Sequence, residues 1–277
     1  MELNQQGLTG SWYEPATSGQ GCEVEVFPDL VGPNVGLIQV SWFTFDTTGG
    51  AAERQRWYTL SGNAQTGQPT ASLTIYQNIG GNFNAPPVTN GVAVGTATLR
   101  FASCADGQLT YDFTDGSGRD GSIPLTRLTQ NATCSTTGAR PTNADFALSG
   151  NWYDPATAGQ GFTVEVNPGS ATIFLAWYTY AAAGASAGAA GQRWFTGQGD
   201  FSPGTRSIPI TLYETNGGTF DSTATTPHSV AVGTATLAFR SCAGATLNFN
   251  FTGGSSSGAS GLIALSRIGP VPQGCTH

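Results

Sequence analysis

The chain has 277 residues and a formal net charge of −7, and only 10% of its residues are charged. All ten basic residues are arginine, and the acidic balance disfavours nucleic-acid binding, which needs clustered basic side chains against the phosphates. Scarce charge and 39 glycines disfavour a helical bundle or coiled coil. No apolar run reaches the roughly 20 residues of a membrane-spanning helix. The composition therefore predicts a folded protein with no nucleic-acid partner and no membrane span.

An internal duplication is the clearest feature of the chain. Residues 8–26 read LTGSWYEPATSGQGCEVEV, and residues 148–166 read LSGNWYDPATAGQGFTVEV. Further matched segments follow in the same order, the longest being VAVGTATLRFASCA (92–105) and VAVGTATLAFRSCA (230–243). A repeat of this length is typical of two copies of one folding unit.

The two copies predict two domains, residues 1–138 and 139–277, that meet in a polar stretch of the chain. Within each copy, apolar and polar side chains alternate in short runs, such as 92–101 and 109–113, and Gly-rich turns separate these runs. Eight such runs in sequence predict an all-β fold of two tandem, eight-stranded, up-and-down antiparallel barrels. A pair of β-sandwiches is the alternative, because alternation does not reveal whether a sheet closes on itself.

The first predicted strand of each copy carries a familiar tryptophan. The segments GSWY and GNWY, around Trp12 and Trp152, resemble the G-x-W motif of the calycin superfamily, which includes lipocalins and avidins. Those proteins pack an arginine of the last strand over this tryptophan. Arg127 and Arg267 lie on the last predicted strands here. The resemblance therefore implies that a guanidinium stacked on an indole closes one end of each barrel.

The residues after Trp-Tyr limit that resemblance. Glu14 and Asp154 stand where avidins have an asparagine, so the biotin contacts do not carry over. The W-Y-[DE]-P-A-x-x-G-Q-G segment also resembles a repeat of secreted proteins from Gram-negative bacteria. The first residues show neither a basic nor an apolar signal region, which is what a mature secreted chain with an added Met1 would show. We expect a secreted or periplasmic bacterial protein.

Five cysteines support that compartment. The duplicated positions predict the disulfides Cys104–Cys134 and Cys242–Cys275, which tie the tail of each unit to its own barrel. Duplicated cysteine pairs are typical of an oxidising compartment. Cys22 remains unpaired, and we interpret it as a buried thiol that packs as a small hydrophobic group.

Catalytic groups are few. His228 is the one internal histidine and has no counterpart in the first copy, which argues against a Ser-His or Cys-His nucleophile and against a zinc site. The loop 115–121 resembles an oxygen-rich calcium loop, but its counterpart lacks carboxylates, so a hairpin turn is the better interpretation. We expect no metal and no cofactor.

Paired carboxylates are the remaining catalytic option. Glu25 matches Glu165, and Glu14 matches Asp154 in charge. Glu14 and Glu25 would have to approach one another across a hairpin. The alternative is that Glu25 faces outward, paired with Arg56.

Aromatic side chains give the strongest indication of function. All six tryptophans lie at matched positions, and several share a strand face with threonines. Aromatic rings beside hydroxyl and amide groups suit a sugar or another ring-bearing ligand, although such rings also fill barrel cores. The candidate ligand-binding residues are Gln20, Trp42, Arg56, Trp57 and Tyr76 in the first copy and Gln160, Trp177, Arg193, Trp194 and Tyr213 in the second.

Three functions remain open at this point. The first is a secreted binding protein with two homologous barrel sites for a glycan or a small amphipathic ligand. The second is a secreted glycoside hydrolase or lyase that uses the carboxylate pairs. The third is a structural or surface assembly subunit, whose Thr-rich strands pair between chains in self-association.

Overall fold

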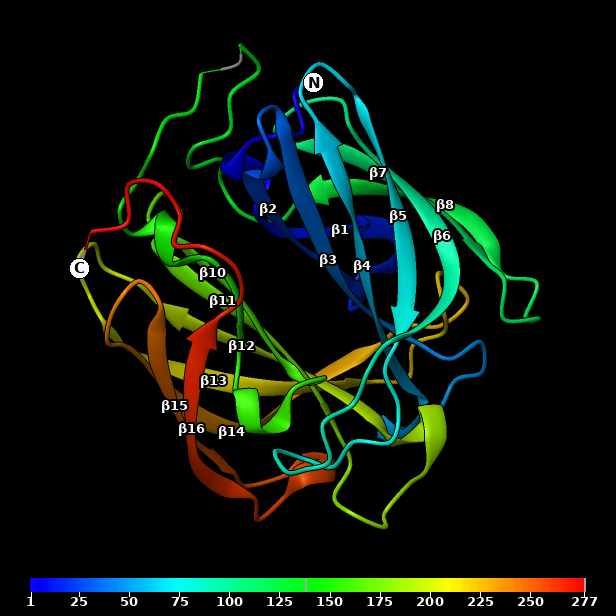
Figure 1. The fold of residues 1–277 in the computed structure, drawn as a ribbon. Helices are drawn as coiled ribbons and strands as arrows, with labels where there is room; N and C mark the ends of the chain where they lie inside the picture. The colour runs from blue at the N-terminus through cyan, green and yellow to red at the C-terminus, as the bar shows by residue number, and fades with distance from the viewer. Residues whose placement is uncertain (138, 277) are drawn as a thin grey trace.

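The structure, a computed structural model, describes residues 1–137 and 139–276. Its strands form two closed barrels, and each strand pairs with its neighbours in sequence (Figure 1). The predicted all-β fold of two up-and-down, eight-stranded antiparallel barrels is confirmed, and the sandwich alternative is wrong. The predicted domain boundary at residue 138 and the last residue, 277, lie outside the described residues.

The first barrel closes where β1 pairs with β8, through the registers Trp12↔Arg127 and Tyr13↔Thr126. Its strands are β1 (Gly10–Tyr13), β2 (Gly21–Gly32), β3 (Val35–Phe45), β4 (Gln55–Gln65), β5 (Thr70–Gln77), β6 (Val92–Phe101), β7 (Asp106–Phe113) and β8 (Asp120–Arg127).

The second barrel repeats this arrangement and closes through the registers Trp152↔Arg267 and Tyr153↔Ser266. Its strands are β9 (Gly150–Tyr153), β10 (Gly161–Asn167), β11 (Thr172–Tyr180), β12 (Gln192–Asp200), β13 (Ser207–Asn216), β14 (His228–Phe239), β15 (Gly244–Phe251) and β16 (Ser260–Arg267).

Helical structure is confined to short 3-10 turns between the strands. These are η1 (Gln6–Leu8), η2 (Pro15–Thr17), η3 (Ala52–Arg54), η4 (Phe146–Leu148), η5 (Pro155–Thr157), η6 (Gly188–Gly191) and η7 (Gly254–Ser256). In the described part of the chain, no helix has the length and apolarity needed to cross a membrane.

One end of each barrel is closed by an arginine on a tryptophan. The Arg127 guanidinium carbon lies 4.5 Å from the centre of the Trp12 ring, and Arg267 lies 4.5 Å from that of Trp152. Arg127 also donates to the carbonyls of Gly7, Thr9 and Cys104. A guanidinium has five N–H donors, so one side chain satisfies three otherwise orphaned carbonyls while it covers an indole face.

The disulfides lie beside these stacks. Cys104–Cys134 and Cys242–Cys275 are both formed, which confirms the predicted pairing. Each ties the tail after the last strand to the β6–β7 or β14–β15 turn of the same barrel. Cys22 is buried and free, and burial raises the pKa of its thiol, so the group is held as a neutral thiol.

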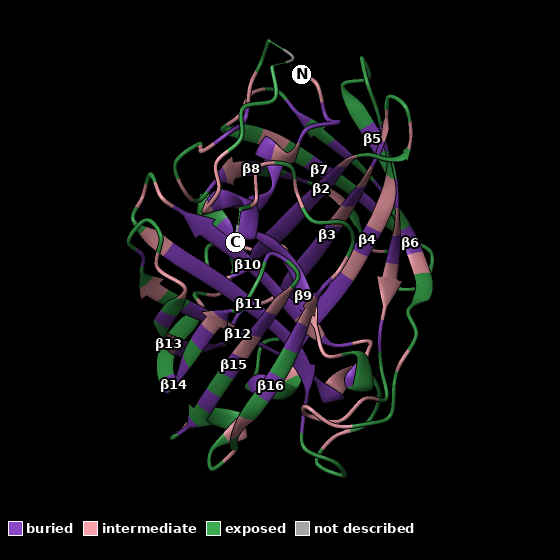
Figure 2. Cartoon of the chain, turned by 60° about the vertical axis from the view of Figure 1, so that its left-hand side comes forward, coloured by how far each residue is buried: buried purple, intermediate pink, exposed green. Residues whose placement is uncertain are grey.

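The two barrels pack against each other through strands that are buried on both faces. Figure 2 shows β2, β3, β10 and β11 buried along most of their length, whereas β15 and β16 alternate between buried and exposed. Across this interface the Trp57 indole donates to the Thr179 carbonyl at 3.1 Å, and the Trp194 indole donates to the Thr44 carbonyl at 2.9 Å. The duplicated residues therefore make the same contact twice, in opposite directions, as in a two-fold dimer.

Each barrel also receives an aromatic plug from the other. The loop 217–227 of the second repeat places Phe220 in the first core, with its ring centre 5.3 Å from that of Trp42. The loop 78–91 of the first repeat places Phe83 against the second core, 5.4 Å from Trp177. In Figure 1 these are the gold loop against the first barrel and the teal loop against the second. The barrel interiors are filled by side chains from both repeats.

Two glutamines of the duplicated segment hold these plugs. Gln20 accepts hydrogen bonds from Thr44 Oγ1 at 2.6 Å and from the Asp221 amide at 3.2 Å. Gln160 accepts from Thr179 Oγ1 at 2.8 Å and from the backbone N–H of Asn84 at 3.1 Å. Each of the two side chains therefore joins its own barrel to a loop of the other repeat.

We predict that Phe220→Ala lowers the free energy of unfolding by about 3 kcal/mol, because it removes a buried ring and leaves a cavity over Trp42. Urea unfolding measures this change, and tryptophan emission should shift to the red as water reaches the indole. Leu262→Ala is the control, since that side chain is 66% exposed and its loss should cost less than about 0.5 kcal/mol. Equal effects of the two changes would contradict the assignment of Phe220 as a plug.

Candidate functional site: a cleft between the barrels

A cavity of about 320 Å³ lies between the two barrels, and we call it the inter-barrel cleft. One wall is the outer face of β3–β5, and the other is formed by β9, the turn after it, and β10. It is lined by Gln39, Val40, Ser41, Trp57, Thr59, Leu60, Ser61, Tyr76, Asn78, Asn151, Trp152, Tyr153, Gly159, Gln160, Gly161, Phe162, Thr163, Tyr178 and Ile268.

Strand register sets the first wall. Ser41 lies opposite Thr59, and Thr59 lies opposite Tyr76, so these three outward side chains form a row across β3, β4 and β5. Gln39 and Ser61 form a second row, two residues further along the strands. Because successive side chains of a strand alternate between faces, the apolar residues between these rows point into the barrel.

Hydrogen bonds fix the second wall to the first. The side-chain amide of Asn151 donates through Nδ2 to Gln39 Oε1 at 3.1 Å and accepts at Oδ1 from Thr163 Oγ1 at 2.7 Å. The Tyr178 hydroxyl donates to the Ser41 carbonyl at 3.1 Å. The cleft is therefore preformed, with its polar groups held in place before any ligand arrives.

One buried amide in the lining has unused hydrogen-bonding capacity. Asn78 is 8% exposed, its Nδ2 donates to the Gly159 carbonyl at 3.3 Å, and its Oδ1 has no partner within the described residues. A buried acceptor without a partner costs roughly 1–3 kcal/mol, so a native example indicates strain, an ordered water or a missing ligand.

The lining contains no Asp, Glu, Lys, Arg or His. Its ionisable groups are the hydroxyls of Tyr76, Tyr153 and Tyr178, and burial raises the pKa of Tyr178 well above its ordinary value. The cleft is thus uncharged at neutral pH, with aromatic rings beside hydroxyl and amide groups.

The predicted ligand-binding residues do not gather at one place. Trp57, Tyr76 and Gln160 line the inter-barrel cleft. Trp42 and Trp177 pack in the barrel cores and do not line the cleft. They share a strand face with threonines because the plugs of the other repeat cover that end of each barrel. Trp57 is as deeply buried as they are, at 1% exposed, and its indole is engaged with the Thr179 carbonyl.

The remaining predicted binding residues of this set lie elsewhere. Trp194 is buried in the aromatic cluster between the barrels, and Tyr213 does not line the cleft. Arg56 is ion-paired with Asp46 at 2.5 Å and holds its own β3–β4 loop. Arg193 likewise donates to carbonyls next to its own strand. Neither arginine is placed to orient a ligand in the cleft.

Glu25 and Glu165 are structural links between the repeats. Glu25 accepts from the backbone N–H of Asn151 at 2.6 Å, and Glu165 accepts from the backbone N–H of Ser11 at 2.9 Å. Glu25 does face out of its own barrel, but the second barrel buries it, and its ionic partner is Arg267 at 3.5 Å. The expected pairing with Arg56 is wrong.

The predicted carboxylate pairs do not form. In the β1–β2 pairing Gly10 lies opposite Val24, so Glu14 and Glu25 lie at opposite ends of the hairpin, on the order of 15 Å apart at the usual rise per residue. Glu14 is instead beside Asp221, and Asp154 caps η5 by accepting from the Ala156 amide at 2.9 Å. This separation removes the basis of a two-carboxylate site.

The sequence reasoning missed Glu23, which is 1% exposed. Its Oε2 accepts from Ser11 Oγ at 3.0 Å, and its Oε1 has no partner in the described chain. Burial and the neighbouring Glu165 raise the pKa of Glu23. The VEV alternation that predicted an outward face was correct, but nothing in it showed that a second barrel would cover that face.

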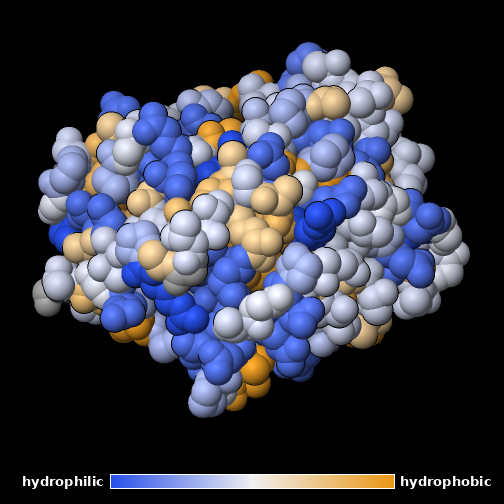
Figure 3. Space-filling view, turned by 90° about the horizontal axis from the view of Figure 1, so that it is seen from above, coloured by the Kyte–Doolittle hydropathy of each residue, from blue (hydrophilic) through white to orange (hydrophobic). Residues whose placement is uncertain are grey.

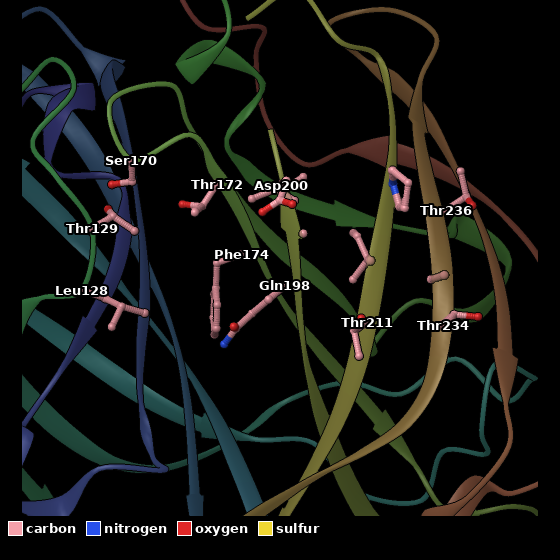
Figure 4. Close-up of a pocket in the computed structure, with 15 residues that line it drawn as sticks. Leu128, Thr129, Ser170, Thr172, Phe174, Gln198, Asp200, Thr211, Thr234 and Thr236 are labelled. Carbon is pink, nitrogen blue, oxygen red and sulfur yellow. The ribbon is translucent and has the colours of Figure 1, made fainter. Parts of the chain in front are cut away.

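The other side of the interface carries a more open groove of about 810 Å³, on the outer face of β11–β14 (Figure 4). Phe174, Gln198 and Leu128 line it at the positions that correspond to Gln39, Ser61 and Ile268 of the inter-barrel cleft. The groove and the cleft correspond at these three positions, but within the described residues the groove has no counterpart of the cleft's second wall. An aromatic ring occupies the place of the amide that organises the inter-barrel cleft.

On the face seen in Figure 3, hydrophilic and intermediate side chains are interspersed, and one modest apolar patch lies near the centre. Comparison of the chain with protein-family models, curated proteins and solved structures finds no match. The calycin likeness remains a prediction drawn from the GSWY and GNWY segments.

The buried acids predict a pH dependence of stability. Burial raises the pKa of Glu25 to about 8 from an ordinary 4.5, and it raises that of Glu23 as well. Between pH 4.5 and pH 8 these carboxyls stay protonated in the folded chain but are ionised in the unfolded chain. The free energy of unfolding should therefore fall as pH rises from 5 to 8. The Glu23→Gln/Glu25→Gln variant should flatten this decline by roughly 2 kcal/mol, measured by urea unfolding at each pH. Parallel profiles for variant and parent would contradict the prediction.

Proposed function

We propose that this protein is a binding module that holds one neutral saccharide unit in the inter-barrel cleft. The observation that carries the proposal is the lining itself: the partly exposed rings of Tyr76 and Tyr153, a set of hydroxyl and amide groups, and no charged side chain. Aromatic faces stack on the apolar faces of sugar rings, while hydroxyls and amides donate and accept hydrogen bonds with the sugar hydroxyls.

The size and rigidity of the cleft agree with this ligand class. Its volume of about 320 Å³ is at the lower end of small-molecule sites, which span about 300–1,000 Å³. Its walls are joined by the Asn151–Gln39 and Tyr178–Ser41 hydrogen bonds, so little ordering is needed on binding.

A hydrolase or lyase finds less support. Glycoside hydrolysis generally uses two carboxyl groups on either side of the scissile bond. The cleft has none, and Glu25 and Glu165 are engaged with backbone amides of the opposite repeat. Assembly through edge strands is also disfavoured, because both sheets close and leave no unpaired edge among the described strands.

We also place this function outside the cytoplasm. The two disulfides suit an oxidising compartment, where a saccharide-binding module would meet polysaccharides or their fragments. The bacterial origin and secretion implied by the duplicated motif belong to this proposal.

The test is calorimetric titration with glucose, galactose, mannose and N-acetylglucosamine, with the total tryptophan emission followed in parallel. We expect at least one sugar to bind saturably, and Tyr76→Ala to weaken it about tenfold through loss of a stacking ring. Tyr213→Ala is the matched control, because it removes the duplicated tyrosine, which lies outside the cleft.

Three outcomes would count against the proposal. These are no binding of any of the four sugars, equal losses in the two tyrosine variants, and turnover of the corresponding oligosaccharides seen by mass spectrometry. The last outcome would favour the enzyme instead.

A further inference from the structure

The row of side chains formed by Ser41, Thr59 and Tyr76 continues beyond the inter-barrel cleft. Strand register places Ser41 opposite Glu23 on β2, and Glu23 opposite Ser11 on β1. Neighbouring strands lie about 4.8 Å apart, so Glu23 stands one strand away from the cleft lining. Its side chain is fully buried, because the second barrel covers this end of the row.

Ser11 joins two carboxyl groups where the barrels meet. Its hydroxyl donates to Glu23 Oε2 at 3.0 Å, and its backbone N–H donates to Glu165 Oε2, from the second barrel, at 2.9 Å. Glu165 Oε1 accepts from Thr129 Oγ1 and from Asn167 Nδ2. Both oxygens of Glu165 therefore have donors, as suits an ionised carboxylate, which can only accept. We call the contact of Ser11, Glu23 and Glu165 the seam.

The duplicated counterpart of the seam contains one acid fewer. There the backbone N–H of Asn151 donates to Glu25 at 2.6 Å, and Asn151 Oδ1 accepts from Thr163 Oγ1 at 2.7 Å. Thr163 stands at the position of Glu23. A hydroxyl is thus sufficient for this packing, so the barrel geometry does not require the carboxyl of Glu23.

The arginines of the interface serve the other acids. Arg267 lies 3.5 Å from Glu25, and Arg127 interacts electrostatically with Glu165. Glu23 has no ion pair among the described residues, and its Oε1 has no hydrogen-bond partner there. The carboxyl of Glu23 is therefore buried without a counter-charge of its own.

The remaining titratable groups around Glu23 disfavour its ionised form. Glu165 of β10 faces it across the seam, and Tyr178 of β11 and the Cys22 thiol also lie within reach of its charge. Burial raises the pKa of Glu23, and the charge of Glu165 raises it further. If Glu23 ionises, two like charges meet at Ser11 out of water, and entry of water into the seam relieves their repulsion.

We propose that Glu23 is a pH-sensitive latch of the inter-barrel cleft, which keeps the seam closed while its carboxyl is neutral and opens it when the carboxyl ionises. An open, hydrated seam releases the proton of Glu23 more readily than a closed one, so rising pH favours opening. Opening separates Ser41 from Tyr178, whose hydrogen bond of 3.1 Å joins the two walls of the cleft. Sugar affinity should then fall as pH rises. This last effect rests on the proposed function, whereas opening of the seam does not.

Amide hydrogen exchange of the ¹⁵N-labelled full chain measures the opening. Between pH 5 and pH 8 the protection of the Ser11 N–H should fall at least about tenfold in the parent relative to Glu23→Gln at the same pH. The reason is that each unit of pKa difference between the open and closed seam changes the opening equilibrium tenfold. Amides of β6 report unfolding of the whole first barrel and should lose less protection.

Two further variants complete this experiment. Asp112→Asn removes an exposed carboxyl of β7 and is the matched control, which should behave like the parent. Glu23→Thr introduces the residue of the second repeat, so it keeps the test available if Glu23→Gln folds poorly. It should remove the pH dependence of Ser11 protection in the same way.

The sugar titrations, repeated at both pH values, test the effect on the cleft. A sugar that binds at pH 5 should bind the parent at least about threefold more weakly at pH 8, because only the closed fraction is competent, and should bind Glu23→Gln equally at both. Unchanged Ser11 protection, an equal fall in Glu23→Gln, or a parent affinity that does not change with pH would each overturn the latch. If no sugar binds but Ser11 protection falls only where Glu23 is present, the proposed function fails and the seam opening is upheld.

Discussion

The reciprocal exchange of aromatic plugs is the interaction on which the rest of this structure depends. Phe220 of the second repeat completes the first core, and Phe83 of the first repeat packs on the second. Neither barrel is filled by its own strands alone, so the hydrophobic stabilisation of each unit includes a contribution from the other. The duplicated chain behaves in this respect like an obligate dimer whose two subunits have been joined.

This exchange decides where a ligand can bind. Closed barrels of eight strands often hold one small ligand in the interior. Here the interior is occupied by side chains. The side-chain oxygens of Gln20 and Gln160 already accept hydrogen bonds from the plug loops and from threonines of their own barrels. The available concave surfaces are those that the pairing of the barrels creates. The two repeats have diverged at these surfaces. Gln39 and Phe174 occupy equivalent positions, and Gln39 lines the polar inter-barrel cleft whereas Phe174 lines the open groove.

The buried carboxyls belong to the same interface. Glu25 and Glu165 each accept a backbone amide of the opposite first strand, which orients one barrel on the other. Burying acids is costly and seldom adds net stability, but a hydrogen bond that forms only in one register specifies that register. One side-chain oxygen of the neighbouring Glu23 is buried without a hydrogen-bond partner in the described chain, so the interface also contains a destabilising group.

Alternation between neighbouring residues was enough to predict the strands, and the duplicated cysteine positions were enough to predict both disulfides. The number of runs favoured a barrel but left the sandwich open, and the stack of Arg127 on Trp12 was implied by the resemblance of the GSWY segment. The same pattern assigned Glu25 to an outer face, correctly, and then failed on its surroundings, since period-two alternation says which face a side chain occupies and nothing of what covers that face. Trp57 and Tyr76 were predicted to bind a ligand, but their partner wall, Asn151 to Thr163, lies between 75 and 106 residues away in sequence. By itself, the sequence determined two copies of one barrel. Only the tertiary structure decided that their outer faces and loops would meet, because that packing is made between segments whose spacing carries no periodic signal.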